Sequence, residues 1–325
     1  MRVFNTVIIG LGNIGMGFDY KTSADGTVLS HATSFAIHPG FRLCAGVDPD
    51  GEKRRLFVEK FNAPAFAALE EVPRSIPMDV VAVASPTRFH CEDVLAALQH
   101  DPTGILCEKP LALSTADAEK MIVQCKVANC LLGVNYIRRF EPGTLELKER
   151  IQNGAFGACC KGTVWYTKGL YNNASHFIDL LMFIFGAPVA QRVIRNNRFW
   201  QETDPEPDFV LTFPGEADVH FIALPSENFS LTEMHLAFSG GLVRYQRGGA
   251  DLMVYSTVPD PVFTGYTTLD PDGQKIKTDF KRYQKYAVEA FYQALTTGRP
   301  MASTAVTALE TLRVTDSIHK EVRSL

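Results

Sequence analysis

A glycine pattern near the amino terminus is typical of a dinucleotide-binding turn. The pattern G-x-G-x-x-G directly follows the apolar residues 7–9, which we predict to form the first strand of a parallel sheet. Glycines at this spacing let the backbone turn tightly, and the first amide groups of the following helix then face a pyrophosphate. An ordinary turn between a strand and a helix is the alternative. We predict that the dinucleotide contacts Gly10, Gly12, Asn13, Ile14 and Gly15.

A carboxylate after the second predicted strand bears on the choice between NAD and NADP. Asp48 follows the apolar residues 43–47, where an acid ordinarily accepts hydrogen bonds from a ribose. Its charge would repel the additional phosphate of NADP by about 4 kcal/mol at about 4 Å, in a medium of effective dielectric about 20. We therefore predict NAD, with Arg54 and Arg55 on a solvated helix face; NADP would be favoured if these arginines turned inward.

The segment between the glycine turn and Asp48 is unusually long. Asp48 follows Gly15 by 33 residues, whereas the usual interval is about 20, so this part of the chain contains an insertion. We place it at residues 19–28, which are polar and include a glycine. The insertion lies next to the glycine turn in the sequence. Two interpretations stay open: the insertion borders the cofactor or substrate cleft, or it is a surface loop.

The first part of the chain alternates apolar segments with helical ones, as in a doubly wound parallel sheet. A helix is indicated at residues 88–99 by the spacing of apolar side chains, and another begins at a capping pattern at residues 114–117. Further strands are predicted at residues 80–84, 105–107 and 131–134.

After about residue 140 turn-bounded segments rich in β-branched and aromatic residues predominate, which predicts a largely antiparallel sheet. The predicted strands are residues 158–168, 190–200, 209–213, 218–224, 231–238 and 242–246. The predicted helices are residues 145–152, 175–185, 280–297 and 303–323.

Length and composition bound the class of protein. At 325 residues the chain exceeds the size of one hydrophobic core, and its 46% hydrophobic and 21% charged residues with a net charge of -4 are those of a globular protein without affinity for nucleic acid. The amino-terminal apolar stretch is too short for a signal peptide or a membrane span, so we expect a cytoplasmic protein with no membrane partner. Seven cysteines without metal-binding spacing predict free thiols and no metal site.

Several further motifs resemble those of one enzyme family. They are Ser85-Pro-Thr87 with His90, Glu108-Lys109-Pro110-Leu111, Gly133-Val-Asn-Tyr136 with Arg138-Arg139-Phe140, Asn173-Ala-Ser-His176-Phe-Ile-Asp179, and Gly298-Arg-Pro300. With the glycine turn, their order is similar over essentially the whole chain to the glucose–fructose oxidoreductase, inositol dehydrogenase and rhizopine catabolism (Gfo/Idh/MocA) family. The resemblance implies an NAD-binding Rossmann domain at residues 1–128. It also implies an α/β domain with a large, mostly antiparallel open sheet at residues 129–325, whose last helices pack back on the first domain.

The same resemblance assigns residues at the carboxyl ends of the parallel strands, where doubly wound sheets bind ligands. The predicted cofactor contacts there are Ser85, Pro86, Thr87, His90, Glu108 and Lys109. The resemblance places Lys109 near the nicotinamide and the substrate, and implies a cis peptide before Pro110. A buried lysine can act as a neutral base or, when charged, stabilise an alkoxide, and both roles stay open.

His176 stands where the family places its catalytic histidine, at the start of an otherwise apolar helix. Imidazole titrates near neutrality and can take a hydroxyl proton as hydride leaves, although a lone histidine here would usually be a packed core residue. Asp179, one helical turn later, can orient His176 or contact substrate. Many members have aspartate four residues before the histidine; Asn172 stands there and can hydrogen-bond a substrate or position His176, but cannot carry a proton.

Other polar residues are candidates for substrate contacts. Tyr166, Lys168 and Tyr171 can stack on or hydrogen-bond a sugar ring, or pack within the sheet, and Arg138 can bind an anionic group. The resemblance implies hydride transfer at a secondary hydroxyl or ketone carbon of a sugar, cyclitol or nucleotide-activated sugar. The alternatives are NAD-dependent glycoside hydrolysis through transient oxidation, and a catalytically silent dinucleotide-binding regulator. The resemblance also implies a homodimer or homotetramer formed through the C-terminal sheet.

Overall fold

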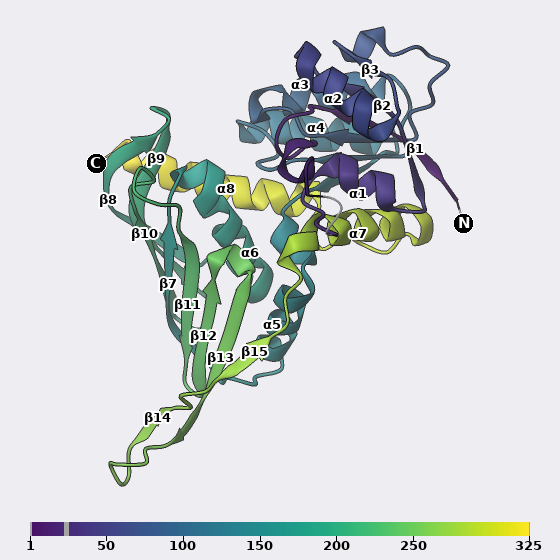
Figure 1. Ribbon diagram of the computed structural model, residues 1–325. Helices are drawn as coiled ribbons and strands as arrows, with labels where there is room; N and C mark the ends of the chain where they lie inside the picture. The colour runs from purple at the N-terminus through teal and green to yellow at the C-terminus, as the bar shows by residue number, and fades with distance from the viewer. Residues whose placement is uncertain (1, 23–25, 325) are drawn as a thin grey trace. The chain divides into compact units, whose positions relative to one another are not determined.

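The computed structural model describes residues 2–22 and 26–324 (Figure 1), and the chain divides into two compact units. Unit 1 comprises Met1–Phe140 and Lys281–Leu312, and unit 2 comprises Glu141–Phe280 and Arg313–Leu325. The sequence placed the boundary after residue 128, which is too early because the strand at residues 131–134 pairs within the first sheet. The chain also returns to unit 1 after completing most of unit 2.

Unit 1 contains a parallel sheet of six strands, in the order β3-β2-β1-β4-β5-β6. The order places β1 and β4 side by side at the centre, which is the arrangement of a doubly wound dinucleotide-binding domain and confirms the predicted fold class. The strands are β1 (Phe4–Ile9), β2 (Phe41–Val47), β3 (Ala65–Phe66), β4 (Val80–Val83), β5 (Gly104–Cys107) and β6 (Leu131–Val134).

Helices flank this sheet and complete its core. The helix α7 (Tyr283–Thr297) buries Ala287, Val288 and Phe291 in the same hydrophobic cluster as Phe35 and Phe41. The C-terminal part of the chain therefore contributes to the first core. The connecting helices of the unit are α1 (His31–Ile37), α2 (Gly51–Phe61), α3 (His90–Leu98) and α4 (Thr115–Val127).

Unit 2 contains a nine-stranded sheet in which the pair formed by β7 and β10 is parallel and the other pairs are antiparallel. This confirms the predicted mostly antiparallel sheet. The sequence missed its last three strands, whose residues alternate only weakly in hydrophobicity. The strands are β7 (Cys159–Tyr166), β8 (Ala190–Trp200), β9 (Asp204–Phe213), β10 (Ala217–Ala223), β11 (Thr232–Phe238), β12 (Gly241–Gln246), β13 (Asp251–Pro259), β14 (Thr267–Leu269) and β15 (Gln274–Ile276).

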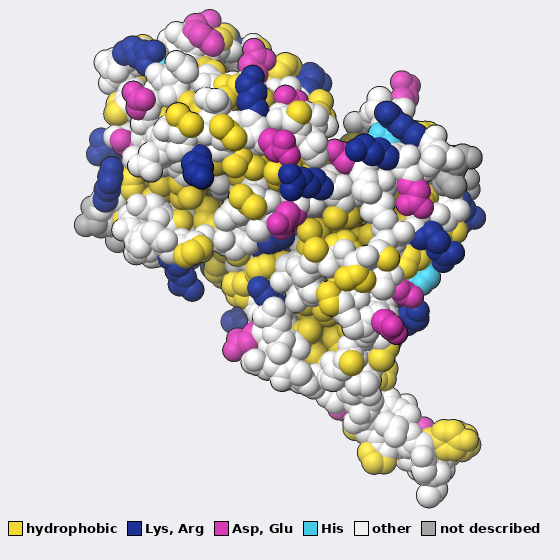
Figure 2. All heavy atoms as spheres, turned by 180° about the vertical axis from the view of Figure 1, so that it is seen from behind, with side chains coloured by type: hydrophobic (Ala, Val, Ile, Leu, Met, Phe, Trp, Pro, Cys, Tyr) yellow, Lys and Arg dark blue, Asp and Glu magenta, His cyan; other side chains and the backbone are white. Residues whose placement is uncertain are grey.

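Helices pack on one face of the second sheet (Figure 1). The core on this face includes residues of α5 (Pro142–Gln152), α6 (Ser175–Phe185) and the end of α8 (Ala305–Val322). A hairpin arm, β13 and β14, extends from the sheet, and its tip exposes the apolar side chains of Val262, Phe263 and Tyr266 (Figure 2).

All seven cysteines are free thiols. None of the helices in residues 2–22 and 26–324 combines the length and hydropathy that crossing a bilayer requires, and the same residues contain no group of three or more side chains arranged to hold a metal ion.

Candidate cofactor and active sites

The glycine turn after β1 is shaped by two close backbone approaches. Gly10 has a φ of 91°, and a Cβ on it would overlap the backbone of Ala84 and Ser85. A Cβ on Gly15 would overlap the carbonyl oxygen of Gly10. Both positions therefore require glycine for the fold itself.

Gly12 differs, because a Cβ there would meet no atom of the described residues within 4 Å. The backbone N–H groups of Gly12, Asn13 and Ile14 also donate to no protein acceptor within residues 2–22 and 26–324. Unpaired amides at the start of a helical turn attract an anion, and a glycine beside them allows close approach. The turn thus fits the pyrophosphate of a dinucleotide.

The helix that follows this turn is interrupted. One helical turn forms, in which Met16 N and Gly17 N donate to Gly12 O, and the chain then departs from the helix axis. The helix resumes at α1, where His31 N donates to Ile14 O (3.0 Å) and Ala32 N donates to Gly15 O (2.9 Å). These bonds span 17 residues instead of the usual four, so about 13 residues are inserted. Without them Asp48 would follow Gly15 by about 20 residues, as is usual.

Buried Asp19 anchors the beginning of the inserted segment to α1. Its carboxylate accepts from Leu29 N (2.7 Å), Ser30 N (3.1 Å), Ser30 Oγ (2.5 Å) and Thr33 Oγ1 (2.8 Å). Lys60 also donates to the carbonyl oxygen of Asp19 at 3.0 Å. Both ends of the insertion are therefore fixed. Residues 23–25 lie outside the described residues, and its place at the cleft stays a prediction.

Asp48 is held by backbone amides of the glycine turn and of its own loop. Its Oδ2 accepts from Leu11 N at 2.8 Å, and its Oδ1 accepts from Asp50 N at 2.9 Å. Arg55 pairs with acids on the surface of α2, as predicted. Arg54 instead lies against the loop, where its Nη1 donates to Asp48 O at 2.8 Å.

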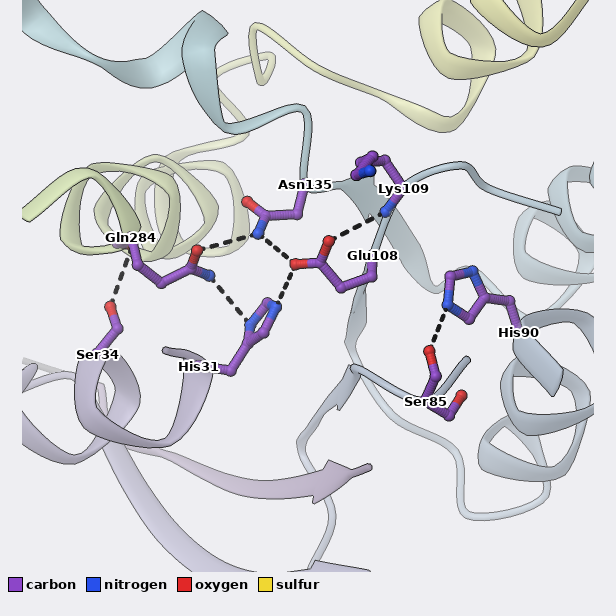
Figure 3. Close-up of polar contacts among 8 residues, drawn as sticks. All are labelled: His31, Ser34, Ser85, His90, Glu108, Lys109, Asn135 and Gln284. Carbon is purple, nitrogen blue, oxygen red and sulfur yellow. Dashed lines mark hydrogen bonds and ion pairs between the residues drawn. The ribbon is translucent and has the colours of Figure 1, made fainter. Parts of the chain in front are cut away.

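The predicted cofactor residues after β4 separate into two groups. The ring nitrogens Nδ1 and Nε2 of buried His90 lie 3.0 Å from Pro110 O and 2.9 Å from Ser85 O (Figure 3). The prediction that His90 contacts the cofactor is wrong, because the ring is enclosed and joins the loops after β4 and β5. Ser85, Pro86 and Thr87 stay predicted contacts.

Lys109 lies at the carboxyl end of β5, half-buried, and the peptide between Lys109 and Pro110 is cis, as predicted. Glu108 beside it is 6% exposed and accepts hydrogen bonds from other elements of unit 1 (Figure 3). His31 Nε2 lies 2.8 Å and Asn135 Nδ2 lies 2.6 Å from Glu108 Oε1. The same Asn135 nitrogen lies 3.0 Å from Gln284 Oε1, and Gln284 Nε2 lies 3.1 Å from His31 Nδ1. We name these four residues the Glu108 ring; the sequence identified only Glu108.

In unit 2 a π-helical turn, Gly169–Ala174, contains Asn172 and leads directly into α6. Two acids of β9 hold this turn through its first amides. Asp204 accepts from Tyr171 N and Asn172 N, both at 3.0 Å, and Glu206 accepts from Gly169 N at 3.2 Å. The sequence did not identify either acid, because both stand next to prolines, before the strand predicted at residues 209–213.

His176 is the second residue of α6 and is half-buried, whereas Asp179 is buried one turn later. Asn172 Nδ2 donates to Lys168 O at 3.1 Å, and Lys168 has a φ of 64°. The turn therefore brings Asn172 and Lys168 together just before His176. The catalytic role of His176 and the substrate roles of Asn172, Asp179 and Lys168 stay predictions.

The two tyrosines before α6 have structural partners. Tyr166 is wholly buried among aromatic side chains, and its Oη donates to Pro207 O at 2.5 Å, so the prediction that it contacts substrate is wrong. It faces inward because strand residues alternate between faces. Tyr171 donates to Asp316 Oδ1 at 2.9 Å and lies beside His319.

Arg138 lies in unit 1, on the short helix Ile137–Phe140 after β6. Burial raises the pKa of Tyr283 to about 12, and the positive charge of Arg138 lowers it in part. Arg138 is therefore near Tyr283, at the start of α7. Its contact with an anionic substrate stays a prediction.

Comparison with known proteins places this arrangement in a family. Residues 4–136 match the family model described as an oxidoreductase family with an NAD-binding Rossmann fold, GFO_IDH_MocA. Residues 4–136 belong to the NAD-binding domain of the Gfo/Idh/MocA family of oxidoreductases. The match covers β1 to β6 and therefore includes the glycine turn, Asp48 and Lys109.

Individual Gfo/Idh/MocA relatives match over different lengths. An inositol 2-dehydrogenase of Rubrobacter xylanophilus is 35% identical over 37% of this chain, and the match spans 35% of that protein. Inositol 2-dehydrogenase 2 of Saccharopolyspora erythraea is 26% identical over 93% of this chain and 88% of its own length. The solved structure of a levoglucosan dehydrogenase with NADH and levoglucosan shares the fold, with a TM-score of 0.79, 17% identity, and coverage of 99% of this chain and 98% of that one.

Proposed function

We propose that this protein is an NAD(H)-dependent dehydrogenase or reductase that acts on a secondary hydroxyl or ketone carbon of a sugar, cyclitol or nucleotide-activated sugar. The observation that carries the proposal is the open side of Gly12 beside the N–H groups of Gly12, Asn13 and Ile14, which donate to no acceptor among the described residues. The names of the inositol and levoglucosan dehydrogenases support the polyhydroxylated class of substrate. Asp48 supports NAD over NADP.

In this proposal bound NAD supplies a hydride acceptor, and the residues of the chain handle the proton. Oxidation breaks the C–H and O–H bonds of the alcohol, so the hydroxyl proton must pass to a protein group while the ketone forms. Lys109 and His176 are the two candidates, and an ammonium at Lys109 would alternatively stabilise the alkoxide. Asn172 would hydrogen-bond the substrate or position His176.

A screen for NADH absorbance with sugars, cyclitols, sugar acids and nucleotide sugars tests the proposal. We expect one class to give NADH, and we expect Lys109→Ala and His176→Ala to lower kcat by about 10²-fold or more. The controls are Lys120→Ala and His100→Ala, which change surface residues of the same types. If the wild type binds NAD but no substrate changes the absorbance, the proposal fails and the regulator interpretation gains. Substrate consumption without net NADH would indicate hydrolysis through transient oxidation.

We also propose that the protein forms a homodimer or homotetramer through the face of the second sheet opposite α5, α6 and α8. Strands there present mixed polar and apolar side chains, including Trp165, His235 and Tyr255, that no helix in the described residues covers. Sedimentation velocity is expected to show an oligomer, and Trp165→Glu is expected to dissociate it. A monomer at micromolar concentration would contradict this proposal.

A further inference from the structure

The Glu108 ring closes on itself inside unit 1, and the amide orientations of Asn135 and Gln284 set the donors and acceptors of its four contacts. Asn135 Nδ2 donates to both Glu108 and Gln284, so Gln284 Oε1 is an acceptor and Gln284 Nε2 is the donor to His31 Nδ1. His31 Nδ1 then carries no hydrogen, and Nε2 donates its hydrogen to Glu108 Oε1. The ring thus contains a neutral His31 and an ionised Glu108.

Reversing the two amides gives an arrangement that needs two more protons. Asn135 Oδ1 would then face Glu108 Oε1, so that oxygen would need a hydrogen. The reversed Gln284 would place its oxygen against His31 Nδ1, so both ring nitrogens of His31 would carry a hydrogen. This arrangement requires a protonated Glu108, whereas the surroundings of Glu108 lower its pKa and favour the carboxylate.

The balance of burial, hydrogen bonding and charge favours an ionised Glu108. Burial alone raises the pKa of Glu108, but the hydrogen bond and electrostatic interaction of His31, the hydrogen bond of Asn135 and the positive charge of Lys109 outweigh it, and the pKa lies below its ordinary value. Electrostatic coupling between two groups is reciprocal. An ionised Glu108 consequently favours the ammonium form of Lys109.

Glu108 is also attached to the backbone of Lys109. Its second oxygen, Oε2, accepts from Lys109 N at 3.2 Å, so one carboxylate oxygen faces the ring and the other faces Lys109 (Figure 3). A residue whose carboxylate accepts three protein hydrogen bonds in the interior has little capacity to bind a cofactor in addition.

His31 connects this carboxylate to the glycine turn. Its backbone N–H donates to Ile14 O, and its side chain donates to Glu108. The residue is 0% exposed, so its ring is fixed by these contacts and not by solvent. The position of α1 on the glycine turn therefore sets where the Glu108 carboxylate stands.

We propose that His31 and Glu108 are positioning residues for Lys109: His31, held by the glycine turn, fixes the Glu108 carboxylate, which in turn fixes the backbone and favours the charged form of Lys109. This inference rests on the proposed function, since that function makes Lys109 a residue of the reacting centre. It replaces the predicted contact of Glu108 with the cofactor.

Two pairs of variants isolate the effect. Glu108→Gln removes the negative charge at nearly constant side-chain volume. Glu289→Gln is its control, because Glu289 also accepts from a histidine: its Oε2 lies 3.0 Å from Nε2 of His38, the residue that ends α1. His31→Gln places an amide where Nε2 stood and keeps a donor to Glu108. His31→Asn has no atom that reaches Glu108 but keeps an acceptor near the former Nδ1.

The primary readout does not require turnover. Lysines are reductively methylated with ¹³C, the Lys109 resonance is assigned with Lys109→Arg, and its titration is followed by NMR. We expect the midpoint for Glu108→Gln to fall by about one pH unit or more, with a smaller fall for His31→Asn and none for Glu289→Gln. The dissociation constant for NAD should stay within about threefold of wild type in all four variants.

Turnover then gives the second readout. We expect kcat to fall about tenfold or more in Glu108→Gln and His31→Asn, with the alkaline limb of its pH profile moved to lower pH, and His31→Gln to recover most of the loss. If Glu108→Gln weakens NAD binding tenfold or more with an unchanged Lys109 titration, Glu108 is a cofactor ligand and the inference is overturned.

Failure of the inference and failure of the proposed function are distinguishable. If no alcohol is oxidised by the wild type but the Lys109 titration shifts as expected, the function fails and the positioning role stands. If turnover is found but Glu108→Gln and Glu289→Gln titrate and react alike, the positioning role fails alone. If Glu108→Gln does not fold, the titration midpoints of Lys109 in His31→Gln and His31→Asn are compared instead. A lower midpoint in His31→Asn supports the inference, and equal midpoints overturn it.

Discussion

Nε2 of His31 lies 2.8 Å from Oε1 of Glu108, although 77 positions separate the two residues in the sequence. The contact exists because α1 resumes on the carbonyl groups of the glycine turn and so carries His31 to the carboxyl end of β5. The glycine turn and the segment that contains Lys109 are thereby joined by one side chain.

Gly12 and Gly15 are expected to respond differently to the same substitution. Gly12→Ala meets no protein atom and should leave the melting temperature within about 2 °C of wild type, while its methyl group occupies the cradle and weakens NAD binding about tenfold or more. Gly15→Ala overlaps Gly10 O and should lower the free energy of unfolding by about 1–3 kcal/mol. Thermal melts and calorimetric titration with NAD measure both effects; equal behaviour of the two variants would contradict the assignment.

Asp48→Asn is expected to reduce the preference for NAD over NADP by at least about tenfold. The amide keeps one oxygen for Leu11 N but lacks the negative charge that repels the additional phosphate. Asp50→Asn, in the same loop and capping α2, serves as the control. An unchanged ratio of the dissociation constants for NAD and NADP would show that Asp48 does not bind the ribose hydroxyl groups.

Asp19→Ala should loosen the insertion and the start of α1. It leaves buried donors of Leu29, Ser30 and Thr33 without their acceptor, at a cost of about 2 kcal/mol or more. Hydrogen exchange of residues 26–37 is expected to become faster, while Asp272→Ala in an exposed loop changes nothing there. Slow exchange in Asp19→Ala would mean that other contacts hold the segment.

The stability of the protein should fall on mild acidification, in part through His90. Burial lowers the pKa of His90, so the unfolded chain binds a proton at higher pH than the folded one. The contribution is complete above the ordinary value of about 6.5 and is lost progressively as the pH falls below it. His90→Gln should therefore reduce the difference between unfolding free energies measured by urea at pH 7 and pH 5. His220→Gln is the control; an unaltered pH dependence in His90→Gln would count against the assignment.

Elements with a strong local pattern were predicted well from the sequence. The helix Ser175–Phe185 and the strand Ala190–Trp200 have the predicted bounds, because each is continuous and ends at turn-forming residues. The insertion was located by counting from Gly15 to Asp48. Its two-part helix was not predictable, since bonds such as His31 N to Ile14 O join segments that no periodicity relates.

Side-chain roles that depend on tertiary contacts were predicted less well. Tyr166 and His90 belong to motifs near the expected sites, but each is turned into the interior by its neighbours. His31 gave no distinctive pattern, because it is simply the first residue of a helix after Ser30. Its function depends on Glu108 and Gln284, which are distant in the sequence and adjacent only in the fold.

Because the helix is interrupted, the length of the inserted segment does not affect the geometry of the glycine turn before it. Ile14 and Gly15 present the same carbonyl acceptors whether the next amides arrive after four residues or after 17. Residues between Met16 and Ser30 can therefore be exchanged as a cassette, provided that a buried acid at the beginning and a serine cap at the end are kept. The protein can thereby acquire a new segment beside the glycine turn without relocating Asp48, His31 or Lys109.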